Sequence, residues 1–137
     1  RFDTRFFLTG LPESPHCRPD GHETVDGIWL SPRQALAANS EGRIPLSPPT
    51  LMTMQEMLPY ETFDSVLKAA ENRHWGDARM PRLVRLESGA RLILAPWDPA
   101  YHQHGLDPGR AVLLPPGAAF SRMLLKDGVW RPISADI

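Results

Sequence analysis

The sequence predicts an α+β fold in which two strands are followed by three helices and then by several short strands. Partly alternating apolar residues favour strands near the N-terminus. Serine, threonine and proline residues mark three helix starts in the middle of the chain, and turn residues divide the last third into short apolar segments. Helices and strands that are segregated along the chain in this way are typical of the α+β class.

Two N-terminal segments are predicted to be strands. Arg1–Leu8 is rich in phenylalanine and places Phe2, Phe6 and Leu8 on one face of an extended chain. Residues 9–21 are predicted to form a loop, because they hold glycines, prolines and an Asp-Gly pair. His22–Leu30 follows as the second strand, with its apolar residues concentrated near its end.

The three predicted helices each have a start signal. A Ser-Pro pair predicts a helix over Pro32–Asn39, because serine caps the first N–H groups and proline is tolerated in the first turn; this helix ends before Gly42. A Pro-Pro pair predicts a second helix that starts at Pro48 and ends at Pro59. Thr62 caps the third helix. Its apolar residues recur at helical spacing: Phe63, Val66, Leu67 and Ala70.

The last part of the chain predicts short strands. Arg82–Leu94 is predicted to be a hairpin that turns near Ser88-Gly89, and Pro96–Gly109 a loop. A short strand is expected over Arg110–Leu114. A second hairpin pairs Ser121–Leu125 with Val129–Ile133 about an Asp-Gly turn. We therefore expect a division into residues 1–75 and a hairpin-rich extension, 76–137, packed on them.

Composition excludes several classes of protein. The 137 residues carry 15 Lys+Arg and 16 Asp+Glu, a net charge of −1, whereas proteins that bind nucleic acid or an anionic membrane need a basic excess. No apolar segment approaches the roughly 20 residues that span a bilayer. The single Cys17 cannot form an internal disulfide, which fits a reducing, cytoplasmic setting. We therefore expect neither a nucleic-acid partner nor a membrane partner.

Few side chains are spaced for catalysis. Cys17 follows His16 directly, and adjacent residues of an extended chain point to opposite sides, so an inert thiol is favoured over a nucleophile with its base. His102 and His104 are spaced so that both imidazoles could face one metal ion, with Asp98 or Asp107 as a further ligand. Surface histidines are favoured over this metal site, because no third ligand has an evident spacing.

An acidic group lies where the predicted loop enters the second strand. Asp20, Glu23 and Asp26 have the carboxylate oxygens that Mg²⁺ prefers, and a carboxylate there could also activate water. The alternative is that these residues are ordinary solvated charges. From the residues alone, ordinary solvated charges are the favoured interpretation.

Three stretches, taken together and in order, resemble the C-terminal half of a Nudix hydrolase. They are Arg1–Leu8, the segment Glu23–Pro32 with its Trp-Leu-Ser-Pro end, and Arg79-Met80-Pro81-Arg82 followed by Asp98 and Tyr101. The branch that they resemble contains the coenzyme A and acyl-coenzyme A diphosphatases.

The resemblance implies a fold, a reaction and a site. The fold would be an α/β/α sandwich around a mixed sheet, and the reaction cleavage of a nucleoside-linked diphosphate with Mg²⁺ or Mn²⁺. The family's Nudix box, with its Arg-Glu-x-x-Glu-Glu core, is absent from this sequence. The resemblance implies that Glu23 is a catalytic residue and metal ligand, and that Asp3 and Arg5 border the substrate.

Two functions are compatible with these features. The preferred one is a Nudix diphosphatase that acts on a small nucleoside diphosphate derivative such as coenzyme A or an acyl-coenzyme A. Because the box would precede Arg1, we expect the chain to be a fragment that is inactive alone. The alternative is a non-catalytic interaction domain that keeps the scaffold. An unpaired strand at Arg1–Leu8 would also allow a second copy of the chain to add a strand and form a homodimer.

Overall fold

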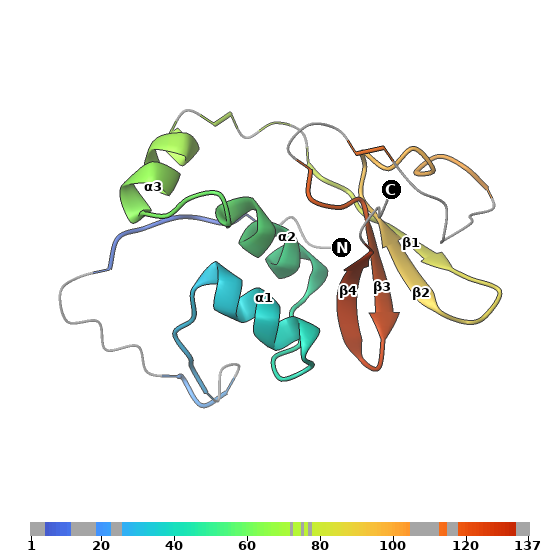
Figure 1. Cartoon of the computed structure of the whole chain (residues 1–137), viewed down its shortest axis with the longest axis horizontal. Coiled ribbons are helices and arrows are strands. Elements are labelled where there is room, and N and C mark those ends of the chain that lie inside the picture. Colours follow the sequence, from blue (N-terminus) through green and yellow to red (C-terminus); the bar gives the residue numbers. More distant parts are fainter. Residues whose placement is uncertain are drawn as a thin grey trace.

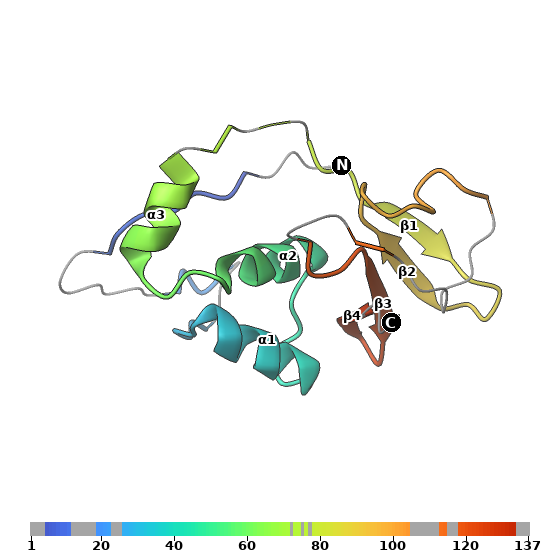
Figure 2. The ribbon, with the colours of Figure 1, turned by 45° about the horizontal axis from the view of Figure 1, so that its top comes forward.

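The structure, a computed structural model, describes residues 5–11, 19–22, 26–71, 73–74, 76, 78–104, 113–114 and 118–133. Within them, three helices precede four strands. Figure 1 shows helices α1 and α2 lying between α3 and the sheet. The view in Figure 2 separates the helices from the sheet in the same way. The α+β class is therefore confirmed.

The helices begin where the sequence predicts. Helix α1 spans Pro32–Ser40, α2 spans Pro48–Met57 and α3 spans Phe63–Glu71. At the start of α1, the Gln34 backbone N–H donates to Ser31 Oγ at 3.3 Å, and the Ser31 N–H donates to Gln34 Oε1 at 2.9 Å. This reciprocal capping box satisfies two N–H groups that a helix start would otherwise leave unpaired.

The four strands form one antiparallel sheet in the order β1-β2-β3-β4. Strand β1 spans Arg82–Arg85 and β2 spans Arg91–Leu94, while β3 spans Arg122–Lys126 and β4 spans Val129–Ile133. Both predicted hairpins are thus confirmed. Asp127 and Gly128, with φ angles of 53° and 76°, supply the left-handed backbone that a tight Asp-Gly hairpin turn requires.

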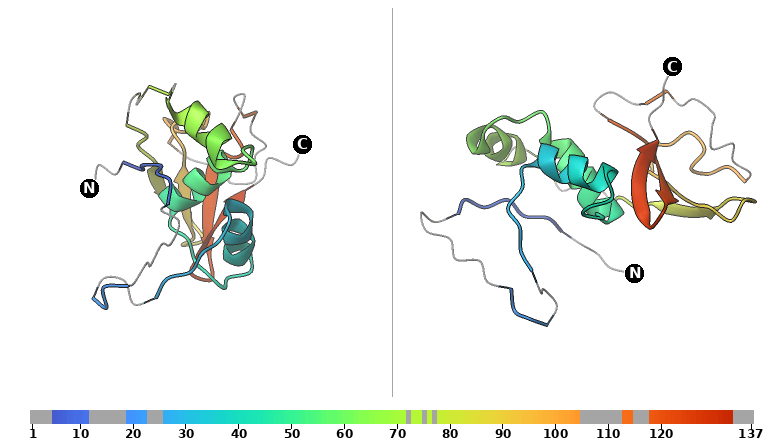
Figure 3. Two further views of the ribbon diagram at one scale, coloured as in Figure 1. Left: turned by 90° about the vertical axis from the view of Figure 1, so that its left-hand side faces the viewer. Right: turned by 60° about the horizontal axis from the view of Figure 1, so that its bottom comes forward.

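The core lies between the helices and one face of this sheet. Leu51 of α2 is fully buried and packs with Ile93, Phe120 and Met123. Asn39 at the end of α1 is also buried: its Nδ2 donates to the Trp130 carbonyl at 3.0 Å, and its Oδ1 accepts from the Leu46 N–H at 2.8 Å. The right-hand view of Figure 3 shows from a further side how α1 and α2 lie between α3 and the sheet. Buried amide and apolar contacts thus fix α1 and α2 on the sheet.

The predicted N-terminal strands are wrong over the residues that the structure describes. Residues 5–8 and 26–30 are irregular, while residues 1–4 and 23–25 lie outside the described part. Phe6, Phe7, Ile28 and Trp29 are all exposed, so the alternation does not reflect burial against a core. A strand also needs a hydrogen-bonded neighbour. The described strands form the antiparallel sheet alone, whereas the resemblance implied a mixed sheet.

Residues 113–114, at the end of the predicted strand Arg110–Leu114, are irregular, and residues 110–112 lie outside the described part. Among the described segments, no helix combines the length and the apolar character needed to cross a membrane.

Candidate functional site

The loop after β2 folds back over one end of the sheet. Across the strands, Arg82 faces Leu94, and Leu94 faces Arg122, so the three side chains share one face. Arg82 Nη1 donates to the Tyr101 carbonyl at 2.6 Å and to the Gln103 carbonyl at 2.8 Å. Two arginines of the sheet therefore hold this loop, because Arg122 binds Asp98 from the same loop.

Asp98 is the buried centre of this arrangement. Its side chain is fully buried, and that of Arg122 is 5% exposed. Asp98 Oδ2 accepts from Ser121 Oγ at 2.6 Å and from Arg122 Nε at 2.8 Å. Asp98 Oδ1 accepts from the Ala100 N–H at 2.8 Å and from Arg122 Nη2 at 3.3 Å. Both oxygens are thus hydrogen-bonded within the protein.

These hydrogen bonds fix the charge of Asp98. Burial by itself raises the pKa of the carboxyl group, but the hydrogen bonds from Arg122, Ser121 and Ala100 together outweigh it, and the pKa lies below its ordinary value. Asp98 is therefore an ionised structural anchor of the loop, because its oxygens are already engaged by protein donors.

The same loop meets the segment that precedes β1. The Tyr101 hydroxyl donates to the Met80 carbonyl at 2.6 Å, and Trp97 Nε1 donates to the Phe120 carbonyl at 3.0 Å. The guanidinium carbon of Arg79 lies 5.4 Å from the centroid of the Trp97 ring. The third stretch of the resemblance, Arg79–Arg82 with Asp98 and Tyr101, is therefore one connected unit in space.

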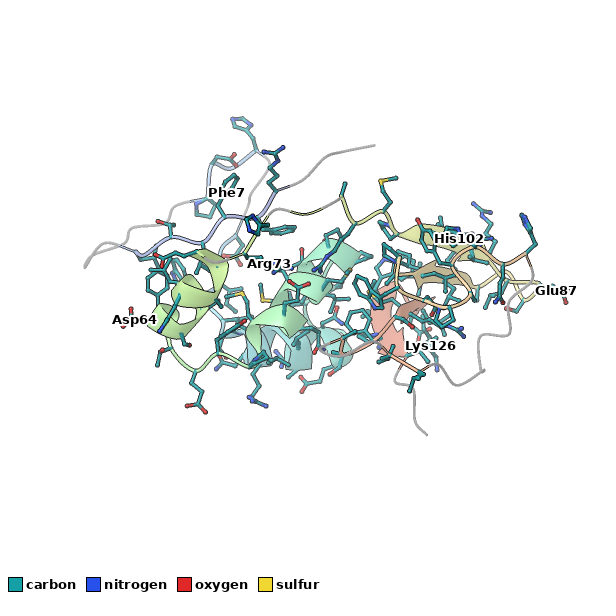
Figure 4. The ribbon with its side chains drawn as sticks, turned by 90° about the horizontal axis from the view of Figure 1, so that it is seen from above. Phe7, Asp64, Arg73, Glu87, His102 and Lys126 are labelled. Atoms are coloured by element: carbon teal, nitrogen blue, oxygen red, sulfur yellow. The ribbon has the colours of Figure 1, made fainter. Side chains whose placement is uncertain are left out.

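Arg79 also belongs to an exposed cluster, which we call the arginine corner: Arg73, Arg79, Glu56 and Trp97. Arg73 Nη1 donates to Glu56 Oε2 at 2.9 Å, and Arg79 Nη1 donates to Glu56 Oε1. The arginine side chains are 56% and 46% exposed, and that of Glu56 is 38% exposed. Figure 4 shows Arg73 on the helical side of the molecule, away from His102 on the sheet side.

The arginine corner carries an excess of positive charge. Partial burial raises the pKa of Glu56. Hydrogen bonds from Arg73 and Arg79, together with the positive charges of these residues, lower it by more, so the pKa lies below its ordinary value. Glu56 is therefore ionised at neutral pH, and one carboxylate faces two guanidinium groups. Charge and exposure make this cluster the best candidate for a binding site in the described part of the chain.

Within its described part, the structure does not bring the predicted site residues together. Arg5 is exposed in an irregular segment, whereas Asp3 and Glu23 lie outside the described part. Of the acidic group around Glu23, Asp20 Oδ1 accepts from the His22 N–H at 2.9 Å and Asp26 Oδ1 from the Gly27 N–H at 2.8 Å. The roles assigned to Asp3, Arg5 and Glu23 remain predictions.

The described side chains around the predicted metal ligands do not form a metal site. His102 packs edge-on against Tyr101, with ring centroids 4.9 Å apart, and Asp98 is committed to Arg122. Asp107 and Cys17 lie outside the described part. The residues that the structure describes contain no group of three His, Cys, Asp or Glu side chains that could hold a metal ion. The Mg²⁺ or Mn²⁺ that the resemblance implies thus has no matching ligand set among them.

Sequence reasoning missed the arginine corner. Glu56 is 17 residues from Arg73 and 23 from Arg79, so no local spacing connects them. Of the four residues of the arginine corner, the Arg-Met-Pro-Arg motif marked Arg79 alone.

The comparisons with known proteins agree with part of the resemblance. The human acyl-coenzyme A diphosphatase NUDT19 is 30% identical to this chain over 102 residues, which are 74% of this chain and 27% of NUDT19. The chain thus spans about a quarter of the length of that relative. No family model matches the chain, and no solved structure matches it. The similarity supports a relationship to a Nudix hydrolase.

Proposed function

We propose that this chain functions as part of a Nudix-type hydrolase that cleaves a nucleoside-linked diphosphate, with coenzyme A or an acyl-coenzyme A as the substrate class. The observation that carries the proposal is the 30% identity, over 102 residues, to a human acyl-coenzyme A diphosphatase. The connected unit of Arg79–Arg82, Asp98 and Tyr101 supports it, because residues that the resemblance singles out contact one another: Tyr101 is hydrogen-bonded to Met80, Arg82 and Asp98. The expected setting is cytoplasmic.

The proposed reaction adds water across a phosphoanhydride and yields two phosphomonoesters. Dependence on Mg²⁺ or Mn²⁺ is part of the proposal. The described side chains do not form a site that matches such a metal ion. The part proposed for this chain is to contribute to substrate binding, with Asp3 and Arg5 bordering the substrate and Glu23 as metal ligand or base.

A direct assay tests the proposed function. The full-length encoded protein is incubated with coenzyme A and with an acyl-coenzyme A, in Mg²⁺ or Mn²⁺ and separately with a chelator, and release of 3′,5′-ADP is measured. We expect metal-dependent release from the full-length protein, and none from residues 1–137 alone. Failure of the full-length protein to hydrolyse any nucleoside-linked diphosphate would reject the proposal.

A second candidate is a non-catalytic interaction domain. It is favoured by the large apolar side chains that lie exposed in the N-terminal segments, among them Phe7, Ile28 and Trp29, which are 78%, 67% and 62% exposed. This alternative predicts no turnover in the same assay. It also predicts that replacing Ile28 and Trp29 by serine leaves stability unchanged and removes association with a partner protein.

A further inference from the structure

We propose that the arginine corner is a binding site for the dianionic phosphate of a phosphomonoester. This assignment is independent of the proposed hydrolase function, because it requires no turnover. It is carried by the convergence of two arginine side chains from the segment after α3 on one carboxylate of α2.

The charge of the cluster favours a dianion. Arg73 and Arg79 together carry two positive charges and Glu56 carries one negative charge, which leaves one positive charge in the cluster. A guanidinium group has five N–H donors, and Glu56 engages one nitrogen of each arginine. The planar arrangement of these donors matches the oxygens of a phosphate, which it can bind through two parallel hydrogen bonds.

The Arg79 side chain is oriented by contacts within the chain. Its guanidinium group lies over the Trp97 ring, and Trp97 is held by the hydrogen bond from Nε1 to the Phe120 carbonyl. Glu56 is held on helix α2 and orients both arginines. Since long side chains lose rotamer freedom when they bind a ligand, this prior ordering lowers the entropic cost of binding.

The same geometry distinguishes between anions. A phosphomonoester carries a charge of about −1.5 to −2 at pH 7, whereas a carboxylate or a phosphodiester carries a single negative charge. A dianion can therefore compete with Glu56 for the two guanidinium groups, while a monoanion gains little over the carboxylate already there. Glu56 thus acts as an internal competitor, and removing its charge should strengthen phosphate binding.

NMR titration of the 137-residue chain tests the assignment at low ionic strength. The probes are inorganic phosphate, 3′,5′-ADP and adenosine, the last lacking phosphate. Arg73→Gln and Arg79→Gln should each weaken binding of both phosphate probes about tenfold, which corresponds to about 1.4 kcal/mol, whereas Glu56→Gln should strengthen it severalfold. Arg43→Gln and Glu41→Gln are matched controls, since they alter another exposed ion pair, and neither should change the affinity.

A binding site is distinguished from a purely structural ion pair by the change in phosphate affinity, which should be an increase for the Glu56 variant and a decrease for the two arginine variants. If Arg73→Gln and Arg79→Gln leave the affinity for phosphate unchanged, or if Glu56→Gln weakens it, the assignment is overturned. Binding of adenosine that Arg79→Gln weakens would also overturn it, because the corner would then recognise the nucleoside. Circular dichroism of each variant verifies that it is folded, and the two arginine variants provide independent tests.

Discussion

Replacing Asp98 by alanine removes a carboxylate that holds the loop after β2 on the sheet. The change deletes the acceptor for Ser121 Oγ, the Ala100 N–H and two nitrogens of Arg122. Arg122 then keeps its charge while its side chain is only 5% exposed. The variant therefore takes the Asp98 carboxylate away from a buried cation, and it also takes this acceptor away from two neutral donors.

The expected loss follows from this burial. Breaking a buried ion pair by removing one partner costs about 3–5 kcal/mol, because the remaining charge stays poorly solvated. A domain of ordinary stability unfolds with a free energy of about 5–15 kcal/mol, so Asp98→Ala should remove a large part of the total. The exposed pair of Glu41 and Arg43 should contribute less than about 1 kcal/mol, which makes Glu41→Ala the control.

Urea denaturation followed by circular dichroism measures both variants. Arg122→Met and the double variant with Asp98→Ala complete a double-mutant cycle. We expect the double variant to lose much less than the sum of the single losses, since the buried carboxylate and the buried guanidinium that faces it are then both removed. A loss below about 1 kcal/mol for Asp98→Ala, or strictly additive losses, would refute this interpretation of the pair.

The remaining predictions concern pH, the core and one turn. The pKa of Asp98 is lowered in the folded chain, so its contribution to stability is present above the unfolded value of about 3.9 and is lost as the pH falls through the folded pKa; acid titration of Asp98→Asn should show a weaker dependence in that range. Asn39→Ala leaves the Leu46 N–H and the Trp130 carbonyl unpaired, which should cost about 1–3 kcal/mol for each group in urea denaturation, and a cost below about 0.5 kcal/mol in total would contradict it. Leu51→Ala should lower the free energy of unfolding by about 2–5 kcal/mol, whereas Leu83→Ala, at a side chain that is 56% exposed, should change it by less than about 0.5 kcal/mol; equal effects would contradict the assigned core. Gly128→Ala places a side chain at a φ of 76° and should lower the melting temperature by an amount equivalent to about 1 kcal/mol, while an unchanged melting temperature would contradict the strained turn.

Local signals explain which elements were predicted correctly. The Ser31 cap, the proline at position 48 and Thr62 each act within one helical turn, and all three helices begin beside them. The Asp127-Gly128 pair fixes a hairpin turn through its own backbone angles. Such elements depend on residues that are neighbours in the sequence, and so their positions can be inferred without tertiary information.

The N-terminal strands and the arginine corner depend on distant residues. The alternation in Arg1–Leu8 shows only that an extended segment could have an apolar face, because pairing requires a second strand to receive its N–H and carbonyl groups. Glu56 and Arg79 are 23 residues apart in the sequence, and their contact, like that of Arg79 with Trp97, depends on the tertiary structure. The Asp98–Arg122 pair, at a separation of 24 residues, likewise follows from the register of β2 and β3 rather than from a motif.

Isotope labelling gives the most direct test of the proposed hydrolase function. The full-length protein is incubated with an acyl-coenzyme A and Mg²⁺ in H₂¹⁸O, and the products are analysed by mass spectrometry. Cleavage of the diphosphate should place one ¹⁸O on a phosphate of one of the two phosphomonoester products and leave the thioester intact. Absence of label on phosphorus, or label in a released fatty-acid carboxylate, would contradict the assignment to a diphosphatase.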